Sequence, residues 1–329
     1  MLAQRTQNLD MPVILDVCNV TKRYRKEGGL FSSGGELFTA VDGVSLALEK
    51  HTTLGIVGES GSGKTTLAKL ILGIEKPDSG RVTLYGRELS ELSGARLRRA
   101  RRGAQMVFQD PYSSLNPRMK VKDIVLEPLR AAGEKIADGE KAAAALLEKV
   151  GLKADALWRY PHEFSGGQRQ RIAIARALAA APGIILADEP ISSLDISIQA
   201  QIMNLLNKLK KELGISYVFI SHDLAAVRYL CDFVAVMYRG CVVEYASAAD
   251  LFRDTRHPYT RLLLSAVPDP DPSKKTVLEE RRDSNGGGPG PRACVFSDRC
   301  PRAAEVCLKE RPGYAEITPG HFVRCVRKE

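Results

Sequence analysis

A run of glycine, serine and lysine begins at Gly58 in this sequence of 329 residues and reads GESGSGKTT. Its spacing, G-x-x-x-x-G-K-[ST], is that of a loop that binds phosphate. A short apolar segment at 54–57 precedes the run and a helical apolar pattern follows it, which is the context that this loop requires. The run therefore predicts a site for a nucleoside triphosphate. The predicted binding residues are Gly58, Glu59, Ser60, Gly61, Ser62, Gly63, Lys64, Thr65 and Thr66.

The residue types in this loop suit the chemistry of phosphate. Glycines let the backbone curl so that its N–H groups meet phosphate oxygens, and the helix that follows adds the positive end of its dipole. We expect Lys64 to supply a mobile charge to the β- and γ-phosphates, and the Thr65 hydroxyl to hold Mg²⁺. The alternative, a glycine-rich turn with a surface lysine, is disfavoured because the strand, loop and helix patterns agree.

Two carboxylates follow an apolar run further along the chain. The run at 184–187 reads IILA, and Asp188 and Glu189 come directly after it. Such a pattern places both carboxylates at the carboxyl end of a strand, where ligands bind in open α/β sheets. We expect Asp188 to orient Mg²⁺ and Glu189 to polarise an attacking water as the catalytic base.

Three more motifs contain polar residues next to predicted elements. Gln109 follows a predicted strand at 104–108, and Ser221-His222-Asp223 follows another at 216–220. In the run FSGGQRQR, the serine hydroxyl and glycine N–H groups that open a predicted helix at 168–181 form a second anion site. Its residues are Ser165, Gly166, Gly167 and Gln168.

Three single residues allow plainer interpretations. Tyr24 is a candidate to stack on a nucleotide base, but a surface tyrosine is as consistent with its position. His222 alone could be an ordinary polar residue. Asp195, in the run SSLD, could be a helix N-cap. Their order beside the other motifs favours roles in the site.

The elements that must position these residues alternate between strands and helices. This alternation predicts an α/β fold with a mostly parallel sheet covered by helices on both faces. The polar segment 22–36 is predicted to be a loop, and 121–158 is helical in pattern. The predicted strands are 13–20, 40–48, 54–57, 81–85, 104–108, 184–187, 216–220, 233–238 and 241–245. The other predicted helices are 89–102, 168–181, 196–213 and 223–230.

Composition and charge restrict the class of protein only loosely. The net charge of 48 − 39 = +9 suits a nucleic acid, an anionic membrane face, or no particular partner. No apolar stretch approaches the roughly 18 to 20 residues of a membrane span, because the most apolar region, 172–187, contains Arg176, Pro182 and Gly183. We therefore expect a cytosolic chain that reaches a membrane only through partners.

The seven cysteines divide into two groups. Cys18, Cys231 and Cys241 lie inside apolar patterns and are expected in the core. The other four follow a predicted linker at 268–291 and have the spacing C-x5-C-x6-C-x17-C. In a reducing cytosol this group favours a metal site over disulfides. An iron–sulfur cluster is favoured over zinc, whose sites usually show paired C-x2–4-C, and free or disulfide-linked thiols are the third alternative. These cysteines are Cys294, Cys300, Cys307 and Cys325.

Taken with the phosphate loop, the run FSGGQ resembles the signature of the ATP-binding cassette (ABC) family. The resemblance implies the phosphate-loop ATPase fold with a helical subdomain, and a head-to-tail dimer that sandwiches two nucleotides. Each site joins one subunit's phosphate loop to the other subunit's Ser165, Gly166, Gly167 and Gln168. It also implies that Tyr24 stacks on adenine, that Gln109 contacts Mg²⁺ and the γ-phosphate, that His222 positions the water, and that Asp195 braces the dimer.

Three longer runs make the resemblance specific to one group within the family. VFQDPYSSLNPRM at 107–119, YPHEFSGGQRQR at 160–171 and HPYTRLLLSAVPDPDP at 257–272 are similar to the ATPase subunits of bacterial dipeptide and oligopeptide importers, with nickel importers as near relatives. The loop KEGGLF before AVDGVSL is similar to the second of the two ATPases that such importers carry. The resemblance implies a [4Fe–4S] cluster on the four C-terminal cysteines, with zinc as the alternative.

The same resemblance implies partners and domains. The partners would be a second, homologous ATPase subunit, two membrane permease subunits that dock on the helical segment, and indirectly an extracytoplasmic peptide-binding protein, at the cytoplasmic face of the membrane; no nucleic acid is expected. The nucleotide-binding domain would span 11–255 with a helical subdomain at about 110–165, and a small cysteine-rich extension would span 256–329. The alternative from another class is a soluble cassette ATPase that acts on DNA or ribosomes. Such proteins usually carry two cassettes or a long coiled coil, and neither is visible here.

Overall fold

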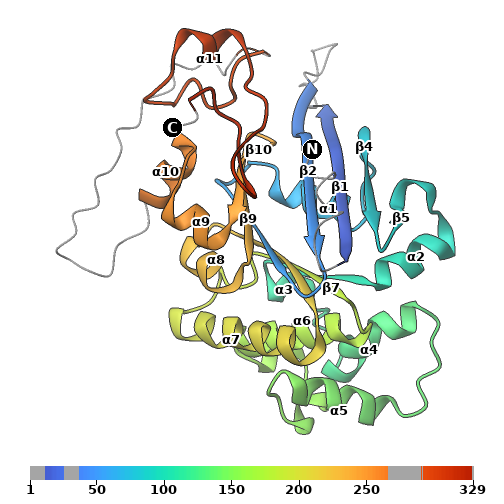
Figure 1. Cartoon of the computed structure of the whole chain (residues 1–329). Coiled ribbons are helices and arrows are strands. Elements are labelled where there is room, and N and C mark those ends of the chain that lie inside the picture. Colours follow the sequence, from blue (N-terminus) through green and yellow to red (C-terminus); the bar gives the residue numbers. More distant parts are fainter. Residues whose placement is uncertain (1–11, 26–36, 266–289, 291, 328–329) are drawn as a thin grey trace, which may run out of the picture.

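The computed structural model describes residues 12–25, 37–265, 290 and 292–327. Two sheets organise this part of the chain (Figure 1). The smaller sheet is antiparallel, with the strand order β2–β1–β4–β5. Its strands are β1 (Val13–Arg25), β2 (Leu37–Glu49), β4 (Ser79–Leu84) and β5 (Arg87–Glu88).

The larger sheet contains the strands that end at the predicted chemical residues. Its order is β11–β12–β10–β9–β3–β8–β7–β6, and β9, β3, β8, β7 and β6 run parallel. The parallel strands are β3 (Thr53–Val57), β6 (Ala104–Val107), β7 (Ile184–Asp188), β8 (Ser216–Ser221) and β9 (Phe233–Tyr238). The antiparallel ones are β10 (Cys241–Ser247), β11 (Ala315–Thr318) and β12 (His321–Val323).

The helices fall into three groups along the chain. Near the smaller sheet are α1 (Lys64–Ile71), the 3₁₀ turn η2 (Leu89–Glu91) and α2 (Gly94–Arg102). The middle of the chain supplies α3 (Pro111–Ser114), α4 (Val121–Ala131), α5 (Gly139–Lys149), η3 (Ala154–Trp158), η4 (Pro161–Glu163), α6 (Gly166–Ala179) and α7 (Ile196–Leu213). The remainder are α8 (Leu224–Leu230), α9 (Ala248–Arg253), α10 (Pro258–Ser265) and α11 (Glu305–Lys309).

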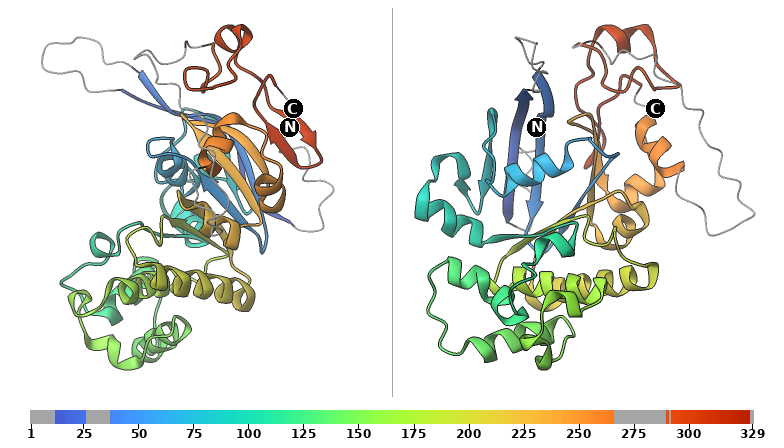
Figure 2. Two further views of the ribbon diagram at one scale, coloured as in Figure 1. Left: turned by 90° about the vertical axis from the view of Figure 1, so that its left-hand side faces the viewer. Right: turned by 180° about the vertical axis from the view of Figure 1, so that it is seen from behind.

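Two hydrophobic cores lie on opposite faces of the larger sheet. On one face, α1 and the inner side of the smaller sheet bury residues such as Leu15, Ile56 and Leu67. On the other, helices α4 to α8 pack around residues such as Ile172 and Phe219. Figure 2 shows α4, α5 and α7 gathered at the end of the molecule far from α11.

Much of the predicted element pattern is confirmed. Helix α7 and strand β9 have the predicted bounds, and α7 ends at Gly214, whose φ of +65° is the left-handed conformation of a helix C-cap. Other expectations were wrong. One face of the larger sheet is covered by the smaller sheet together with α1, not by helices alone. Cys18 is only partly buried, because it pairs with Arg81 at the surface of the smaller sheet.

The polar segment predicted as a loop at 22–36 is also different where it is described. Residues 22–25 continue strand β1 and pair with β2 as far as Arg25 and Leu37, because alternating burial persists despite the charges. Residues 26–36 lie outside the described residues. So does most of the predicted linker at 268–291.

The C-terminal segment is joined to the main sheet. Strand β12 pairs with β10, so the hairpin β11–β12 extends the larger sheet (Figure 1). Phe296 is buried against Tyr238 and Tyr259, with ring centroids 5.2 and 5.4 Å away. The last residues therefore share the hydrophobic core of the preceding part of the chain.

Candidate functional site

The loop between β3 and α1 needs glycine at two positions. Gly58 has φ +154° and Gly63 φ +102°. A Cβ atom on Gly63 would lie 2.1 Å from the Ala40 carbonyl oxygen, and one on Gly58 would lie 2.2 Å from that of Met237. Both approaches are to backbone, so no side chain could move aside. The chain around the loop therefore fixes its curled path before any ligand binds.

Lys64 lies inside this curl. Its Nζ donates to the carbonyl oxygens of Gly58 at 2.7 Å and Glu59 at 2.9 Å, and to Ser62 Oγ at 3.4 Å. Burial lowers the pKa of Lys64, while the nearby carboxylates of Glu189, Asp188 and Glu59 act in the opposite direction. The ammonium group is thus held where an anionic ligand can replace neutral carbonyls as its partner.

Asp188 and Thr65 meet beneath the loop. Asp188 ends β7 and is 5% exposed. Burial raises the pKa of Asp188, and the nearby Thr65 hydroxyl partly offsets this. A hydroxyl and a carboxylate oxygen side by side are ligands of the kind that Mg²⁺ prefers.

Glu189 is held between two other predicted residues. Gln109 Nε2 donates to Glu189 Oε2 at 3.0 Å, and His222 Nδ1 lies 3.3 Å from Glu189 Oε1. The Glu189 backbone has φ +46°, a left-handed conformation that costs a non-glycine residue about 1–3 kcal/mol. Its N–H donates to the Ile220 carbonyl of β8 at 2.9 Å. The sheet therefore holds this carboxylate in a strained position at the edge of the loop.

These residues surround one open pocket of about 600 Å³. Nine of the predicted site residues line it, together with Phe38 and Ala40 of β2, which the sequence did not indicate. Phe38 is 47% exposed, a signal that only the structure provides. The nine are Ser60, Gly61, Gly63, Lys64, Thr65, Thr66, Gln109, Glu189 and His222.

Tyr24 lies beside this pocket but not among its lining residues. Its hydroxyl donates to Glu75, and burial together with that bond raises the pKa of Tyr24 to about 12. Because Tyr24 pairs with Phe38 across β1 and β2, the predicted base-stacking residue and the exposed phenylalanine occupy the same place on the sheet.

The FSGGQ run forms the start of α6. Ser165 caps the helix: its Oγ accepts from Gln168 N–H at 3.4 Å, and its own N–H donates to Gln168 Oε1 at 3.1 Å. A Cβ on Gly167 would lie 2.4 Å from Ile198 of α7, so only glycine fits there. Ser165 and Gln168 are exposed and do not line the pocket, so the chain does not close its own site with them. Asp195 stands at the N-cap of α7 without a side-chain cap bond.

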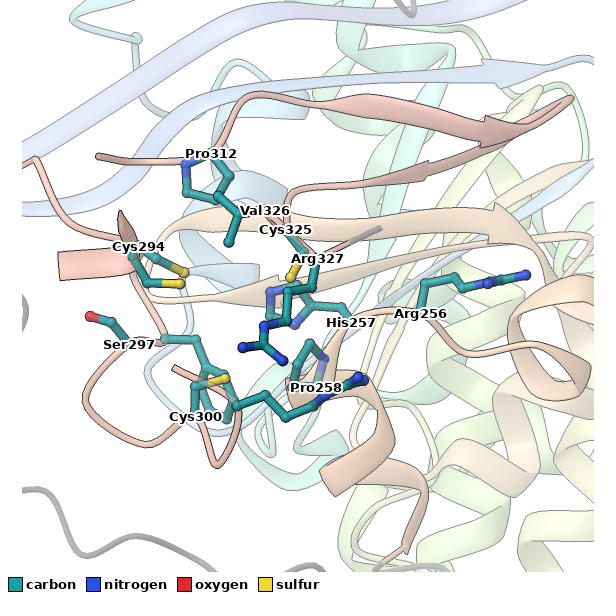
Figure 3. A pocket seen from close by; sticks show the side chains of 13 residues that line it. Arg256, His257, Pro258, Cys294, Ser297, Cys300, Pro312, Cys325, Val326 and Arg327 are labelled. Carbon is teal, nitrogen blue, oxygen red and sulfur yellow. The ribbon is translucent and has the colours of Figure 1, made fainter. Parts of the chain in front are cut away.

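The four C-terminal cysteines line a second pocket with His257 and Arg327 (Figure 3). Every pair among the four thiols is close enough to interact electrostatically. Burial is the largest cause that raises the pKa of Cys294, Cys300 and Cys325, that of Cys300 to about 11. Among the described residues, no three His, Cys, Asp or Glu side chains stand in a geometry ready for a metal ion. These cysteines are Cys294, Cys300, Cys307 and Cys325.

Two residues of the C-terminal third contact the phosphate loop, and the sequence did not indicate either. The Glu59 N–H donates to Tyr259 Oη at 2.9 Å, and Arg299 binds the Glu59 carboxylate with both terminal nitrogens. Neither residue stands next to a phosphate-binding motif in the sequence. Only the fold brings them to the loop.

A glycine loop at the carboxyl edge of a parallel sheet, with a buried lysine and two carboxylates behind it, defines a phosphate-loop nucleoside triphosphatase. Comparison with family models matches residues 41–192 to the ABC transporter family and residues 243–307 to the C-terminal region of oligopeptide/dipeptide transporters.

Relatives and solved structures agree with these matches. The oligopeptide transport ATP-binding protein AppF of Bacillus subtilis is 44% identical over 95% of this chain and 96% of its own length. OppF of Haemophilus influenzae is 42% identical over 98% of both chains. A dimeric structure of the ATP-binding cassette MJ0796 bound to ADP and Pi matches with TM-score 0.63 and 33% identity, over 71% of this chain and 98% of that one.

The chain belongs to the ABC transporter family, in the branch with the oligopeptide/dipeptide C-terminal region, and it is an ATP-binding cassette ATPase. No helix in the described part of the chain is long and apolar enough to cross a bilayer.

Proposed function

We propose that this chain is the ATP-hydrolysing subunit that powers import of dipeptides or oligopeptides through a membrane permease. The observation that carries the proposal is similarity over nearly the whole chain, C-terminal region included, to proteins named for oligopeptide transport. Import of nickel or another small solute is the second candidate. The proposed location is the cytoplasmic face of the membrane, held there by the permease.

We infer the following roles for the main polar residues at the pocket. Lys64 would leave the carbonyls of Gly58 and Glu59 for the β- and γ-phosphates of ATP. Thr65, Asp188 and Gln109 would hold Mg²⁺, which supplies positive charge to the phosphates when bound. Glu189 would accept the proton of the attacking water, and His222 would orient that water and the γ-phosphate.

A second cassette is required to complete the site. Ser165 and Gln168 are exposed at the N-terminus of α6, and none of Ser165, Gly166, Gly167 and Gln168 lines the pocket around Lys64 that the described residues form. We place these residues against the nucleotide of a partner cassette, with Tyr24 at the adenine and Asp195 at the dimer contact. The partner would be a homologous ATPase subunit, so the site alternates between open and closed dimers.

We retain the domain division at 11–255 and 256–329, with a helical subdomain at about 110–165. The helices α4 and α5 of that subdomain contribute no residue to the lining of the nucleotide pocket, and we propose that they receive the permease. The shared sheet makes the second part an extension of the first, so we do not expect it to move as a separate body.

For the four cysteines we propose a [4Fe–4S] cluster, with zinc as the alternative. Four thiols from one chain around one pocket are the donor set that either group requires. A structural role is expected. Iron and acid-labile sulfide should be found at about four atoms each per chain in anaerobically purified protein. Stoichiometric zinc without sulfide would reject the cluster.

Copurification tests the transport assignment. The chain, affinity-tagged in its native host, should be recovered from solubilised membranes with two integral membrane proteins and a second cassette ATPase. Cells carrying Lys64→Ala should then lose uptake of labelled peptides, while Lys208→Ala, an exposed change on α7, should leave it intact. Recovery of nucleic acid or ribosomes instead, with normal peptide uptake in Lys64→Ala cells, would favour the soluble alternative.

A further inference from the structure

The phosphate loop is tied to the cysteine-bearing segment by an ion pair. Arg299 donates from one terminal nitrogen to Glu59 Oε2 at 2.8 Å and from the other to Oε1 at 2.9 Å. The two side chains are 19% and 36% exposed, so water screens the pair only in part. A bidentate arginine–carboxylate pair fixes direction as well as distance. The Glu59 side chain is therefore held in one orientation relative to the segment that carries Arg299.

A second contact fixes the backbone of the same residue. The Glu59 N–H points away from the pocket and donates to Tyr259 Oη at 2.9 Å. The Glu59 carbonyl points inward and accepts from Lys64 at 2.9 Å. Tyr259 is fully buried, and its ring packs 4.5 Å from that of Tyr238 and 5.4 Å from that of Phe296. The Glu59 N–H belongs to the same peptide as the Gly58 carbonyl, which also accepts from Lys64, at 2.7 Å. The orientation of this partner of Lys64 thus depends on an aromatic cluster that Phe296 completes.

Arg299 and Phe296 lie in the short turn between two of the cysteines. The Arg299 N–H donates to the Phe296 carbonyl at 3.1 Å, and the Ser297 N–H donates to the Cys294 carbonyl at 3.0 Å. Arg299 directly precedes Cys300. The turn that begins at Cys294 and ends at Cys300 is therefore the element that places both the guanidinium and the aromatic ring at the loop.

We propose that Arg299 is a positioning residue for ATP binding, and that through it the cysteine-bearing turn holds the phosphate loop in its nucleotide-ready shape. Two physical effects act in the same direction. The ion pair and the Tyr259 bond order residues 58–60 before the ligand arrives, which lowers the entropy cost of binding. Arg299 also neutralises the carboxylate of Glu59, whose negative charge would otherwise repel phosphate bound in the loop. The inference depends on the proposed nucleotide site.

The test measures the affinity for a fluorescent ADP analogue, by equilibrium titration of the purified full chain. Arg299→Met is expected to weaken binding about fivefold or more, the usual lower range for coupling between distinct sites. With ATP as substrate, KM should rise while kcat changes little, because no reacting group is lost. Arg299→Lys should recover part of the affinity, since a lysine keeps the charge but not the bidentate geometry.

Arg311→Met is the matched control. It breaks an ion pair with Asp42 that also ties the C-terminal segment to the main body, at similar exposure, without contacting the phosphate loop. Nucleotide affinity should be unchanged in this variant. Affinity within twofold of wild type in Arg299→Met, or an equal loss in both variants, would overturn the proposal.

Three further variants distinguish a specific effect on the phosphate loop from a general effect on folding. Adding Glu59→Gln to Arg299→Met should weaken binding little further, because Arg299 contacts the phosphate loop through Glu59, and full additivity would reject the pairing. Tyr259→Phe should raise the dissociation constant in the same sense by removing the acceptor for the Glu59 N–H. Lys64→Ala tests the nucleotide site separately from the inference. If Lys64→Ala still binds nucleotide, both the nucleotide site and the inference are rejected. If Lys64→Ala loses binding while Arg299→Met binds as tightly as wild type, only the inference is rejected.

Discussion

At the scale of single residues, Glu189 is held by contacts on both carboxylate oxygens. Gln109 donates to one oxygen, and His222 stands 3.3 Å from the other. A base that is already oriented loses little entropy when water and the γ-phosphate arrive. The strained, left-handed backbone conformation of Glu189 sets the direction of its side chain.

Glu189→Gln is therefore expected to stop hydrolysis without removing the nucleotide. The amide keeps the shape of the carboxylate but cannot take the proton, so phosphate release should fall by about 10²-fold or more. Labelled ATP should remain bound, unhydrolysed, after rapid gel filtration. Glu212→Gln, an exposed change on α7, serves as the control. Wild-type turnover in Glu189→Gln would remove Glu189 as the base.

Sequence reasoning could predict most of the pocket because each motif is local. Glycines, Lys64 and the two carboxylates follow strands whose apolar character is visible without the fold, and parallel strands bring their ends together. Phe38 and Arg299 could not be predicted this way. Phe38 reaches the pocket through pairing of β1 with β2, and Arg299 contacts Glu59 of the phosphate loop across 240 positions of sequence.

At the scale of elements, Glu244 joins three segments inside the protein. It lies on β10, is fully buried, and accepts from the N–H groups of Arg256 and His257 at 2.8 and 3.0 Å and from His321 Nε2 at 2.8 Å. Its single carboxylate thus connects two segments to the main sheet: the residues just before α10, and strand β12. The run VVEYA did not indicate this buried role, because a single acidic residue in a strand is normally interpreted as facing solvent.

Glu244→Ala should lower the free energy of unfolding by about 3 kcal/mol, since two buried donors and one partly buried donor lose their acceptor. Chemical denaturation of the full chain measures this, and the midpoint should shift without a gain in slope. Glu305→Ala, which breaks an exposed pair with Lys309, should change stability by less than about 0.5 kcal/mol. Equal stability of the two variants would mean that Glu244 does not connect these segments.

The prediction of elements failed for part of β1 and for the hairpin β11–β12. Period-2 burial in β1 continues through Lys22 to Arg25, although their charge suggested a loop. The hairpin β11–β12 has short strands that alternation cannot reveal, and it is specified by pairing with β10. Long-range pairing of this kind is invisible to a local pattern.

At the scale of the whole molecule, one chain forms only half of the proposed catalytic site. The pocket that contains Lys64 is open, and the capped N-terminus of α6 is exposed elsewhere on the same chain. In a dimer, the N-terminus of α6 from one cassette would cover the open pocket of the other cassette. This division predicts that hydrolysis depends on assembly, which allows ATP to drive a conformational cycle.

The most direct test of this account is the rate of ATP hydrolysis per chain over a dilution series, with wild type and Ser165→Arg side by side. The turnover of the wild type should fall toward zero as the chain is diluted, because the site exists only in the assembled pair. Ser165→Arg should be inactive at every concentration while still binding nucleotide. A turnover per chain that is independent of concentration, and unaffected by Ser165→Arg, would contradict the shared site.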